Sequence, residues 1–535
     1  MKLQMAEGKD RELFESAGYV LPAFDRARVR EETRKAPEWI HFGAGNIFRA
    51  FQANVCQRLL DAGEISTGLV AAEGFDYEII EKLNRAVDDY SILITLKADG
   101  TVEKKVIGGV VDSYVLDRAD AASFSALAEL FRKPSLKMAS FTITEKGYAL
   151  KDLSGAVLPA VEKDFAAGPD MAESYMGKVV SLLYERFKAG ELPIAMVSMD
   201  NCSHNGDKLS AAVEGCARAW EAAGKTEAAF TKYICDREKV TFPWTMIDKI
   251  TPRPHEAVTE LLKKDGVEGL DLIVTGKKTY LSQFVNAEEA EYLVIEDAFP
   301  NGRLPLDKAG VIFTDRETVD KVERMKVCTC LNPVHTALAV FGCLLGYGKI
   351  SEEMKDPLLI KLARRVGETE GLPVVTDPGI IRPEAFLEEV LTKRIPNPFM
   401  PDTPQRIATD TSQKIPVRFG ETLKAYLKEG PEALDALVAI PLVFAGWLRY
   451  LLGVDDSGKT FELSPDPQLP YLREILKDVR LKETEGLEGK IRPLLENAAI
   501  FGVDLYEAGL AGRVTGYFAE MLAGAGAVRA TLEKI

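Results

Sequence analysis

Hydrophobic and polar residues alternate along the first half of the chain in short blocks that predict strands and helices in turn. Apolar runs bounded by turn residues predict strands at 67–72, 91–96, 138–144, 193–199 and 271–275. Amphipathic stretches between them predict helices at 120–132, 174–188 and 206–223. This alternation is typical of a doubly wound α/β sheet. From about residue 316 the pattern becomes mostly helical and is rich in leucine and alanine.

A strand, a turn containing glycines, a helix and a second strand follow one another between residues 38 and 73. The apolar strand 38–42 leads into the seven-residue turn Gly43, Ala44, Gly45, Asn46, Ile47, Phe48 and Arg49. Glycine is needed in such a turn because a side chain would keep the backbone away from the phosphates of a dinucleotide. The N-terminus of the following helix attracts the same phosphates. We therefore expect this turn to bind a dinucleotide cofactor.

The end of the second strand indicates which dinucleotide. Glu73 stands where a carboxylate can accept hydrogen bonds from the adenosine ribose, and no lysine or arginine immediately follows it. This favours NAD over NADP, whose extra phosphate a carboxylate would repel. The motif has two departures: Phe48 occupies the third-glycine position, and Glu73 comes later than the usual spacing of about 20 residues.

The two patterns together define the predicted architecture. We expect an α/β protein with a Rossmann-type N-terminal domain and a mainly α-helical C-terminal domain. The expected boundaries are an N-terminal extension at 1–35, a dinucleotide-binding domain at 36–315 and a substrate and catalytic domain at 316–535.

Composition narrows the class of partner. The net charge of −15 over 535 residues argues against nucleic acid or an anionic membrane as a partner. Seven cysteines without regular spacing fit a reducing compartment better than a disulfide framework. The first 35 residues are charged, unlike a secretory signal, and no uninterrupted apolar run is long enough to span a bilayer. The expected location is the cytoplasm, and the oligomeric state is left open.

The segment from Lys326 to His335 gathers more candidate chemistry than any other. A helix is expected to end near Cys330, and Asn332 is expected to cap the next helix, with Pro333 in its first turn. Lys326 and His335 can converge only if the chain bends near Leu331. A helix–turn–helix with a core histidine and a surface lysine is the structural alternative. Zinc binding by Cys328, Cys330 and His335 is disfavoured because no second ligand cluster occurs.

Three further stretches carry candidate site residues. Asn201 follows the apolar strand 193–199, where ligands of open α/β sheets gather, although an Asx turn would need the same residue. Asp248 lies between apolar residues in a proline-flanked segment, where it either contacts substrate hydroxyls or pairs with a cation. Arg406 and Lys414 are eight residues apart, which puts them on roughly one side of a helix. Most such pairs are merely solvated.

Taken in order, these stretches resemble the polyol-specific long-chain dehydrogenase/reductase family. The resemblance extends from about Ile40 through the helical second half. It implies that Lys326 is the catalytic acid/base, that Asn201 and Asn332 bind the reacting oxygen, and that His335 orients it. It further implies that Glu323 gates proton exchange with solvent, that Asp248, Arg406 and Lys414 contact the substrate, and that no metal takes part.

The expected activity follows from that resemblance. It is an NAD-dependent interconversion of D-fructuronate and D-mannonate, with tagaturonate reductase and mannitol 2-dehydrogenase as the close alternatives. Lys249, Arg253 and Arg418 are further candidates for binding a carboxylate. A non-catalytic dinucleotide sensor is the alternative from another class. The interval from Lys326 to Asn332 is one residue longer than the family pattern, and we expect the stretch 328–331 to absorb it.

Overall fold

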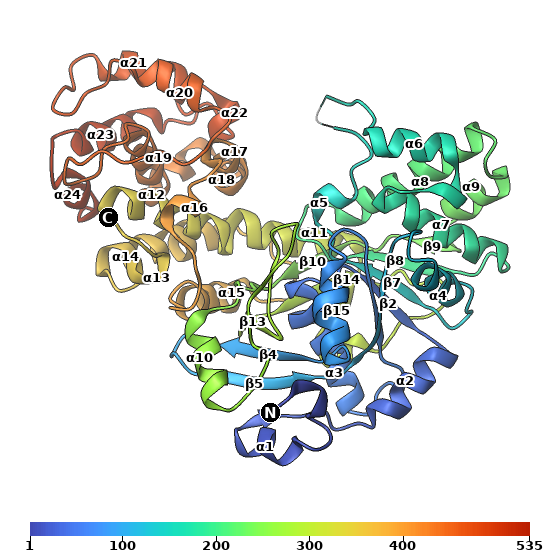
Figure 1. The fold of residues 1–535 in the computed structure, drawn as a ribbon. Coiled ribbons are helices and arrows are strands. Elements are labelled where there is room, and N and C mark those ends of the chain that lie inside the picture. The colour runs from blue at the N-terminus through green and yellow to red at the C-terminus, as the bar shows by residue number, and fades with distance from the viewer. Residues whose placement is uncertain (153) are drawn as a thin grey trace. The chain divides into compact units, whose positions relative to one another are not determined.

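A computed structural model describes residues 1–152 and 154–535 of the chain (Figure 1). The chain divides into two compact units. The N-terminal unit comprises Met1–Leu96 and Thr101–Asp320, and the C-terminal unit comprises Lys97–Gly100 and Lys321–Ile535.

The N-terminal unit is built on a six-stranded sheet in which every pair of neighbours is parallel. Its spatial order is β6 (Val110–Val115), β3 (Leu69–Glu73), β2 (Trp39–Phe42), β7 (Met138–Phe141), β8 (Ile194–Ser198) and β9 (Val240–Thr241). The chain runs outward from β2 through β3 to β6 and then returns to the other side of β2. The strand order therefore reverses at β2, and ligands of doubly wound sheets bind at such a reversal. The expected Rossmann-type fold is confirmed.

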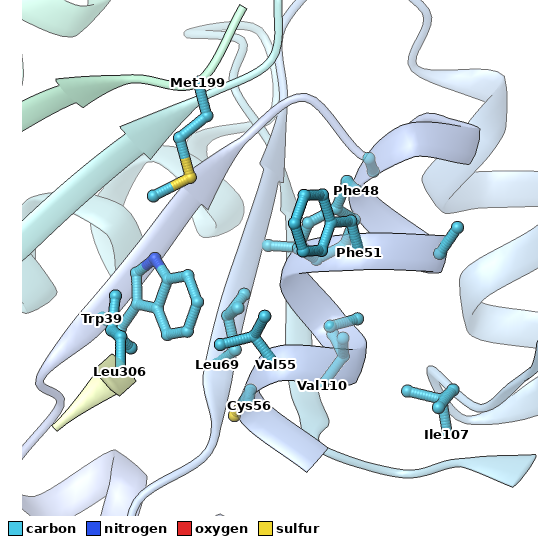
Figure 2. Packing of buried hydrophobic residues seen from close by; sticks show 14 of the residues in the cluster. Trp39, Phe48, Phe51, Val55, Cys56, Leu69, Ile107, Val110, Met199 and Leu306 are labelled. Carbon is cyan, nitrogen blue, oxygen red and sulfur yellow. The ribbon is translucent and has the colours of Figure 1, made fainter. Parts of the chain in front are cut away.

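Helices flank this sheet, and the three predicted at 120–132, 174–188 and 206–223 are observed within one residue at each end, as α4 (Ala121–Phe131), α7 (Tyr175–Lys188) and α8 (Asn205–Ala222). The other helices of the unit include α3 (Ala53–Asp61), α5 (Thr144–Gly147), α6 (Pro159–Ala167), α9 (Ala228–Cys235) and α10 (Glu256–Lys264). Successive strand residues point to opposite faces. Accordingly Trp39 of β2 enters one apolar cluster, whereas Ile40 and Phe42 enter the other. Figure 2 shows the first cluster, with Trp39 and Phe48 among its members.

Three further sheets lie outside the main one. The first is mixed, with order β1 (Tyr19–Val20), β5 (Val102–Ile107), β4 (Ser91–Leu96) and β13 (Phe284–Glu288). The second contains β10 (Thr245–Asp248), β14 (Tyr292–Glu296) and β15 (Ile312–Thr314). The third pairs β11 (Ile273–Val274) with β12 (Tyr280–Leu281).

Two strand predictions need correction, and one strand falls in an unexpected sheet. The run 91–96 is a strand, but it pairs with β5 and β13 and not with the parallel sheet. The run 138–144 ends as a strand at Phe141, because the backbone beyond it turns to bind Asp200. The run 271–275 keeps only Ile273–Val274, and Val274 is exposed.

Residues 1–35 fold as part of the N-terminal unit. They form α1 (Arg11–Ser16), β1 and α2 (Arg26–Lys35). The Arg26 guanidinium is buried and donates to Asp88 and to the Gly108 and Val110 carbonyls. Charge-assisted bonds of this kind are stronger than neutral ones. They attach α2 to the turn before β4 and to the start of β6.

The C-terminal unit is helical, as expected. Its longest helices are α12 (Asn332–Leu345), α19 (Ala439–Tyr450), α23 (Ala511–Met521) and α18 (Gly420–Glu429). The shorter ones are α13 (Ile350–Glu353), α14 (Pro357–Arg364), α15 (Pro383–Glu389), α16 (Pro404–Ile407), α17 (Thr411–Arg418), α20 (Leu469–Leu476), α21 (Leu487–Leu495), α22 (Ala498–Phe501) and α24 (Ala527–Leu532). Every residue of α19 is buried. The buried Glu370 carboxylate accepts backbone N–H groups of Val438, Ala439 and Ile440, which satisfies donors that a helix start leaves unpaired.

One helical run, Arg316–Leu345, combines α11 (Arg316–Met325), a π-helical segment and α12. By length and composition it could cross a membrane, contrary to the sequence expectation that no such run exists. Most of its apolar window, 78%, is buried inside the protein, which is also what the core helix of a folded domain shows.

Candidate functional site

The turn after β2 depends on two glycines for different reasons. Gly43 has a φ of 103°, and a Cβ on it would lie 2.2 Å from the Thr142 carbonyl oxygen at the end of β7. Gly43 is therefore required by the protein's own backbone. A Cβ on Gly45 would meet no atom within 4 Å. The space beside Gly45 is open to a ligand, as a phosphate approaching the backbone requires.

Glu73, at the end of β3, holds this turn in place. One carboxylate oxygen accepts the Ala44 N–H at 2.8 Å, and the other accepts those of Phe75 and Asp76 at 2.8 and 3.0 Å. Glu73 is buried, and burial raises the pKa of its carboxyl. Its expected contact with a ribose stays a prediction, because its present partners are backbone groups.

Phe48 explains how the motif works without a third glycine. That glycine normally lets helix and strand pack closely. Here Phe48 begins a π-helical segment, Phe48–Gln52, and its ring stacks on the buried His41 ring of β2 with centroids 4.5 Å apart. The wider helical turn and the stacked rings fill the space between helix and strand. The phenylalanine is thus a packing residue of the first apolar cluster (Figure 2).

Several buried polar atoms around the turn have no hydrogen-bond partner among residues 1–152 and 154–535. They are Asn46 Oδ1, Arg49 Nη1 and Tyr175 Oη. Asn46 Nδ2 donates to the Tyr280 carbonyl at 3.3 Å, and Arg49 Nη2 donates to the Ser282 carbonyl at 2.8 Å. Buried polar atoms without partners are rare and costly, so their gathering near one turn fits a site that a polar ligand completes. These residues therefore suit a dinucleotide.

A cavity of about 350 Å³ in the N-terminal unit brings together three of the predicted residues: Ile47, Asn201 and Asp248. Asp248 is the last residue of β10 and is buried. Lys249 also lines the cavity, but its ammonium pairs with Glu291 at 3.0 Å and donates to the Glu288 carbonyl. Lys249 is therefore committed to an internal ion pair, which does not favour it as a substrate-binding cation.

The cavity also contains functional candidates that the sequence patterns did not single out. Asp200 accepts the backbone N–H groups of Ile143 and Thr144, each at 2.9 Å, and the Tyr148 hydroxyl at 2.5 Å. These bonds hold Thr144 at a φ of 63°, which is unusual for a β-branched residue. Thr144 and Asn201 line the same cavity. The only signal in the sequence was that Asp200 directly precedes Asn201.

In the C-terminal unit, Lys326 begins a π-helical segment. The segment spans Lys326–Cys330, and the Leu331 N–H donates to the Lys326 carbonyl at 3.0 Å. A π-helical bond encloses one residue more than an α-helical bond. The π-helical segment therefore holds one residue more than an α-helical turn would, and it includes Cys328–Cys330 of the stretch where an extra residue was expected. The Lys326 side chain is buried, with 4% of the residue exposed. It is not the surface lysine of the structural alternative.

Asn332 starts α12 and does not cap it, which corrects the expectation. Leu331 is the capping residue, with the His335 N–H donating to its carbonyl at 3.0 Å. The backbone is already helical at Cys330, the end of the π-helical segment, so α12 begins only one residue after it. Pro333 lies in the first turn, as expected.

His335 lies among cations. Burial, followed by the charges of Arg418, Arg406, Arg394 and Lys414, lowers the pKa of its imidazole to about 3. The imidazole is therefore neutral at physiological pH and has one donor and one acceptor nitrogen. Its Nε2 lies 3.5 Å from Asp402 Oδ2, and the other Asp402 oxygen accepts from Arg406.

Each unit thus gathers its own share of the predicted residues. The N-terminal unit holds the glycine turn, Glu73, Asn201 and Asp248. The C-terminal unit holds Glu323, Lys326, Asn332, His335, Arg406 and Lys414, of which His335, Arg406 and Lys414 form one electrostatic cluster. Glu323 precedes Lys326 by three residues and is partly buried. Across residues 1–152 and 154–535, no three His, Cys, Asp or Glu side chains are grouped as metal ligands would be.

Comparison with known proteins places both units in one family. Residues 37–308 match the mannitol dehydrogenase Rossmann domain, and residues 318–522 match the mannitol dehydrogenase C-terminal domain. The D-mannonate oxidoreductase of Thermotoga maritima is 51% identical, over 100% of this chain and 99% of that protein.

Two solved structures share the fold. A D-sorbitol dehydrogenase in substrate-free form has a TM-score of 0.79 and 26% identity, over 96% of this chain and 98% of that one. The Pseudomonas fluorescens mannitol 2-dehydrogenase, solved as a ternary complex with NAD and D-mannitol, has a TM-score of 0.68 and 26% identity, over 100% and 99%. This chain therefore belongs to the mannitol dehydrogenase family.

Proposed function

We propose that this chain is an NAD-dependent oxidoreductase that interconverts D-fructuronate and D-mannonate by hydride transfer. The observation that carries the proposal is the 51% identity to a D-mannonate oxidoreductase along the whole of both chains. Oxidation of one secondary alcohol of D-mannonate gives D-fructuronate, so the two compounds are the two sides of one reaction. The cations around His335 support an acidic substrate.

We propose that the two domains have different roles. We assign dinucleotide binding to the domain 36–315, through the turn Gly43–Arg49 and Glu73, and catalysis to the domain 316–535. Residues 1–35 are treated as an extension packed on the first domain. The preference for NAD rests on Glu73, whose carboxylate at the end of β3 disfavours a phosphate there.

Lys326 is proposed to move the proton. When bound, the nicotinamide supplies the hydride for ketone reduction and accepts it in the reverse direction. As the carbonyl is reduced, the Lys326 ammonium gives a proton to the oxygen, and in the oxidation the amine takes it back. Lys326 is buried, so its side chain can meet a bound substrate away from bulk water. In this proposal Lys326, and no metal ion, carries the acid/base step.

The remaining groups stabilise and orient the reacting oxygen. The carboxamide N–H groups of Asn201 and Asn332 are proposed to donate to it, where negative charge develops. The neutral His335 is proposed to orient the same hydroxyl, and Glu323 to exchange the Lys326 proton with solvent. Asp248, Arg406 and Lys414 are proposed to contact the other oxygens of the substrate. The partner is a small sugar acid, with no nucleic acid or membrane involved, and the expected location is the cytoplasm.

Steady-state assays of NADH oxidation test the proposal directly. D-fructuronate should give the highest kcat/KM, above tagaturonate and fructose. A preference for tagaturonate would make the chain a tagaturonate reductase, and a preference for fructose would make it a mannitol 2-dehydrogenase. NADH binding without turnover of any of the three would favour a dinucleotide sensor.

A further inference from the structure

Two cations on α17 lack acidic partners. Lys414 and Arg418 are four residues apart, so they lie one helical turn from each other on the same face. No carboxylate oxygen comes within 4.0 Å of either side chain in the part of the chain that the structure describes. Arg406, by contrast, is neutralised by Asp402. The cluster around His335 therefore contains positive charge that the protein leaves uncompensated.

Leaving these charges unpaired costs stability. Burial and the charge of Arg418 lower the pKa of Lys414 to about 8, and burial lowers the pKa of Arg418 to about 10. Both groups remain mostly protonated at neutral pH. Partly buried charges without a counter-ion destabilise a fold, and they are more common at binding sites than elsewhere. An anion bound between α17 and α12 would remove the cost.

Arg418 is already oriented for such an anion. Its Nη1 donates to the Thr336 hydroxyl at 2.6 Å and approaches the Asn332 carbonyl at 3.4 Å. The Thr336 hydroxyl donates to the same Asn332 carbonyl at 2.9 Å. Arg418 is thus fixed to the first turn of α12, the turn that carries Asn332 and His335.

The other side of the guanidinium is still available. Arginine has five N–H donors in a planar fork, and the hydrogen bonds of Arg418 to the protein use only those on Nη1. Nε and Nη2 donate to no protein atom among residues 1–152 and 154–535. These two nitrogens form the edge that binds a carboxylate through two parallel bonds. Lys414 is less suited, because its ammonium already donates to the Ile407 carbonyl at 3.0 Å.

We propose that Arg418 binds the carboxylate of the sugar-acid substrate through Nε and Nη2 and so determines the preference for an acid over a neutral sugar. The inference rests on the proposed function and adds the residue that reads the charged end of the substrate. Asn332 and His335 act on the reacting oxygen, whereas Arg418 selects the molecule that carries it. Because Arg418 of α17 is bonded to the first turn of α12, the two ends of the substrate would be held from these two neighbouring helices.

The test compares a charged and a neutral ketose in three variants. Arg418→Met removes the charge, Arg418→Lys keeps it without the fork, and Arg473→Met removes an exposed arginine from α20 of the same unit. For Arg418→Met, kcat/KM with D-fructuronate should fall roughly 30-fold or more, as for loss of one partner of a buried charge pair. Its kcat/KM with fructose and its NADH affinity should not change. Arg418→Lys should recover part of the loss, and Arg473→Met should behave as wild type.

The outcomes separate the inference from the proposed function. A wild-type enzyme that reduces fructose but not fructuronate would overturn the proposed function. A wild-type enzyme that reduces fructuronate, with an Arg418→Met variant that loses activity toward both ketoses equally, would leave the function standing. Arg418 would then only position Asn332, and the inference would be wrong. A selective loss of fructuronate turnover supports it.

Discussion

The Glu73 carboxylate accepts the Ala44 N–H at 2.8 Å, so the end of β3 fastens the glycine turn that follows β2. Ala44 and Glu73 are 29 residues apart in sequence. The Glu73 side chain nevertheless holds the backbone of the turn and places a negative charge beside it. A single substitution at Glu73 should therefore affect coenzyme choice and the integrity of the turn together.

Replacing Glu73 by glutamine should weaken NAD selectivity. The amide keeps an acceptor for one N–H group but removes the negative charge that disfavours a 2′-phosphate. We expect the ratio of kcat/KM for NADH to that for NADPH to fall, with a stability loss of about 1–3 kcal/mol from imperfectly satisfied backbone donors. The exposed Glu81→Gln variant on the next helical segment is the control. An unchanged coenzyme ratio in Glu73→Gln would reject the ribose-side role.

The two glycines of the turn should respond differently to alanine. Gly43→Ala forces a side chain into a φ of 103° and against the Thr142 carbonyl, so the melting temperature should fall. The left-handed conformation alone costs roughly 1–2 kcal/mol. Gly45→Ala meets open space, so the free protein should melt as wild type while NADH binds more weakly. Equal NADH affinity in Gly45→Ala and wild type would show that no phosphate approaches this turn.

Lys326→Ala should mainly lower kcat. Removing a general acid/base costs roughly 10²–10⁴-fold in rate. Since the side chain is buried, Lys326→Met is the better-packed control for loss of volume, and it should be equally inactive. Calorimetric NADH affinity should stay unchanged in both. A rise in KM at constant kcat would make Lys326 a binding residue.

Asn201→Ala and Asn332→Ala should each raise the activation barrier by about 2.7–4 kcal/mol, as when an oxyanion-hole donor is removed. The loss should appear in kcat, because the bonds strengthen as charge develops on the oxygen. Asn205→Ala is the control. Asn205 donates to the Thr245 hydroxyl and carbonyl, so its replacement should lower protein stability more than it lowers kcat. If Asn201→Ala leaves kcat unchanged, Asn201 only stabilises the turn after β8 and does not bind the reacting oxygen.

Glu353→Gln should stabilise the protein at alkaline pH. Both carboxyl oxygens are buried against Gly342 with no hydrogen-bond partner in the described part of the chain, and burial raises the pKa of Glu353 to about 9. The folded state therefore holds a proton that the unfolded state releases above about pH 4.5, so stability falls as pH rises from there to about 9. Glutamine removes this dependence. Melting curves between pH 5 and 9 should show a flatter profile for Glu353→Gln, and an unchanged one for the exposed Glu352→Gln. Parallel profiles for wild type and Glu353→Gln would contradict the assignment.

Four strands of the main sheet, β3, β2, β7 and β8, were predictable because they are buried on both faces and read as continuous apolar runs. The two edge strands, β6 and β9, were not predicted. The mixed sheet was not, since β4 and β13 lie almost two hundred residues apart and no local pattern records their pairing. Gly43, Asn201 and His335 could be named from the sequence because each stands at a strand end or near a helix start, and their roles stay predictions. Thr144 was missed because its backbone conformation depends on Asp200, a contact made only in the folded chain.

The π-helical segment at Lys326 has a consequence for how this site can change. A regular α-helix advances about 100° per residue. The six residues from Lys326 to Leu331 hold one surplus residue in a widened helical turn, so the helix beyond it keeps its phase. Losing that one residue would close the widened turn into a regular α-helical turn and leave the Lys326 ammonium in the same direction relative to the downstream carboxamide and imidazole. Losing a residue from a regular stretch of the helix would instead rotate the side chains beyond it by about a quarter turn. The π-helical turn is therefore a place where this run can lose a residue without changing which side chains face one another.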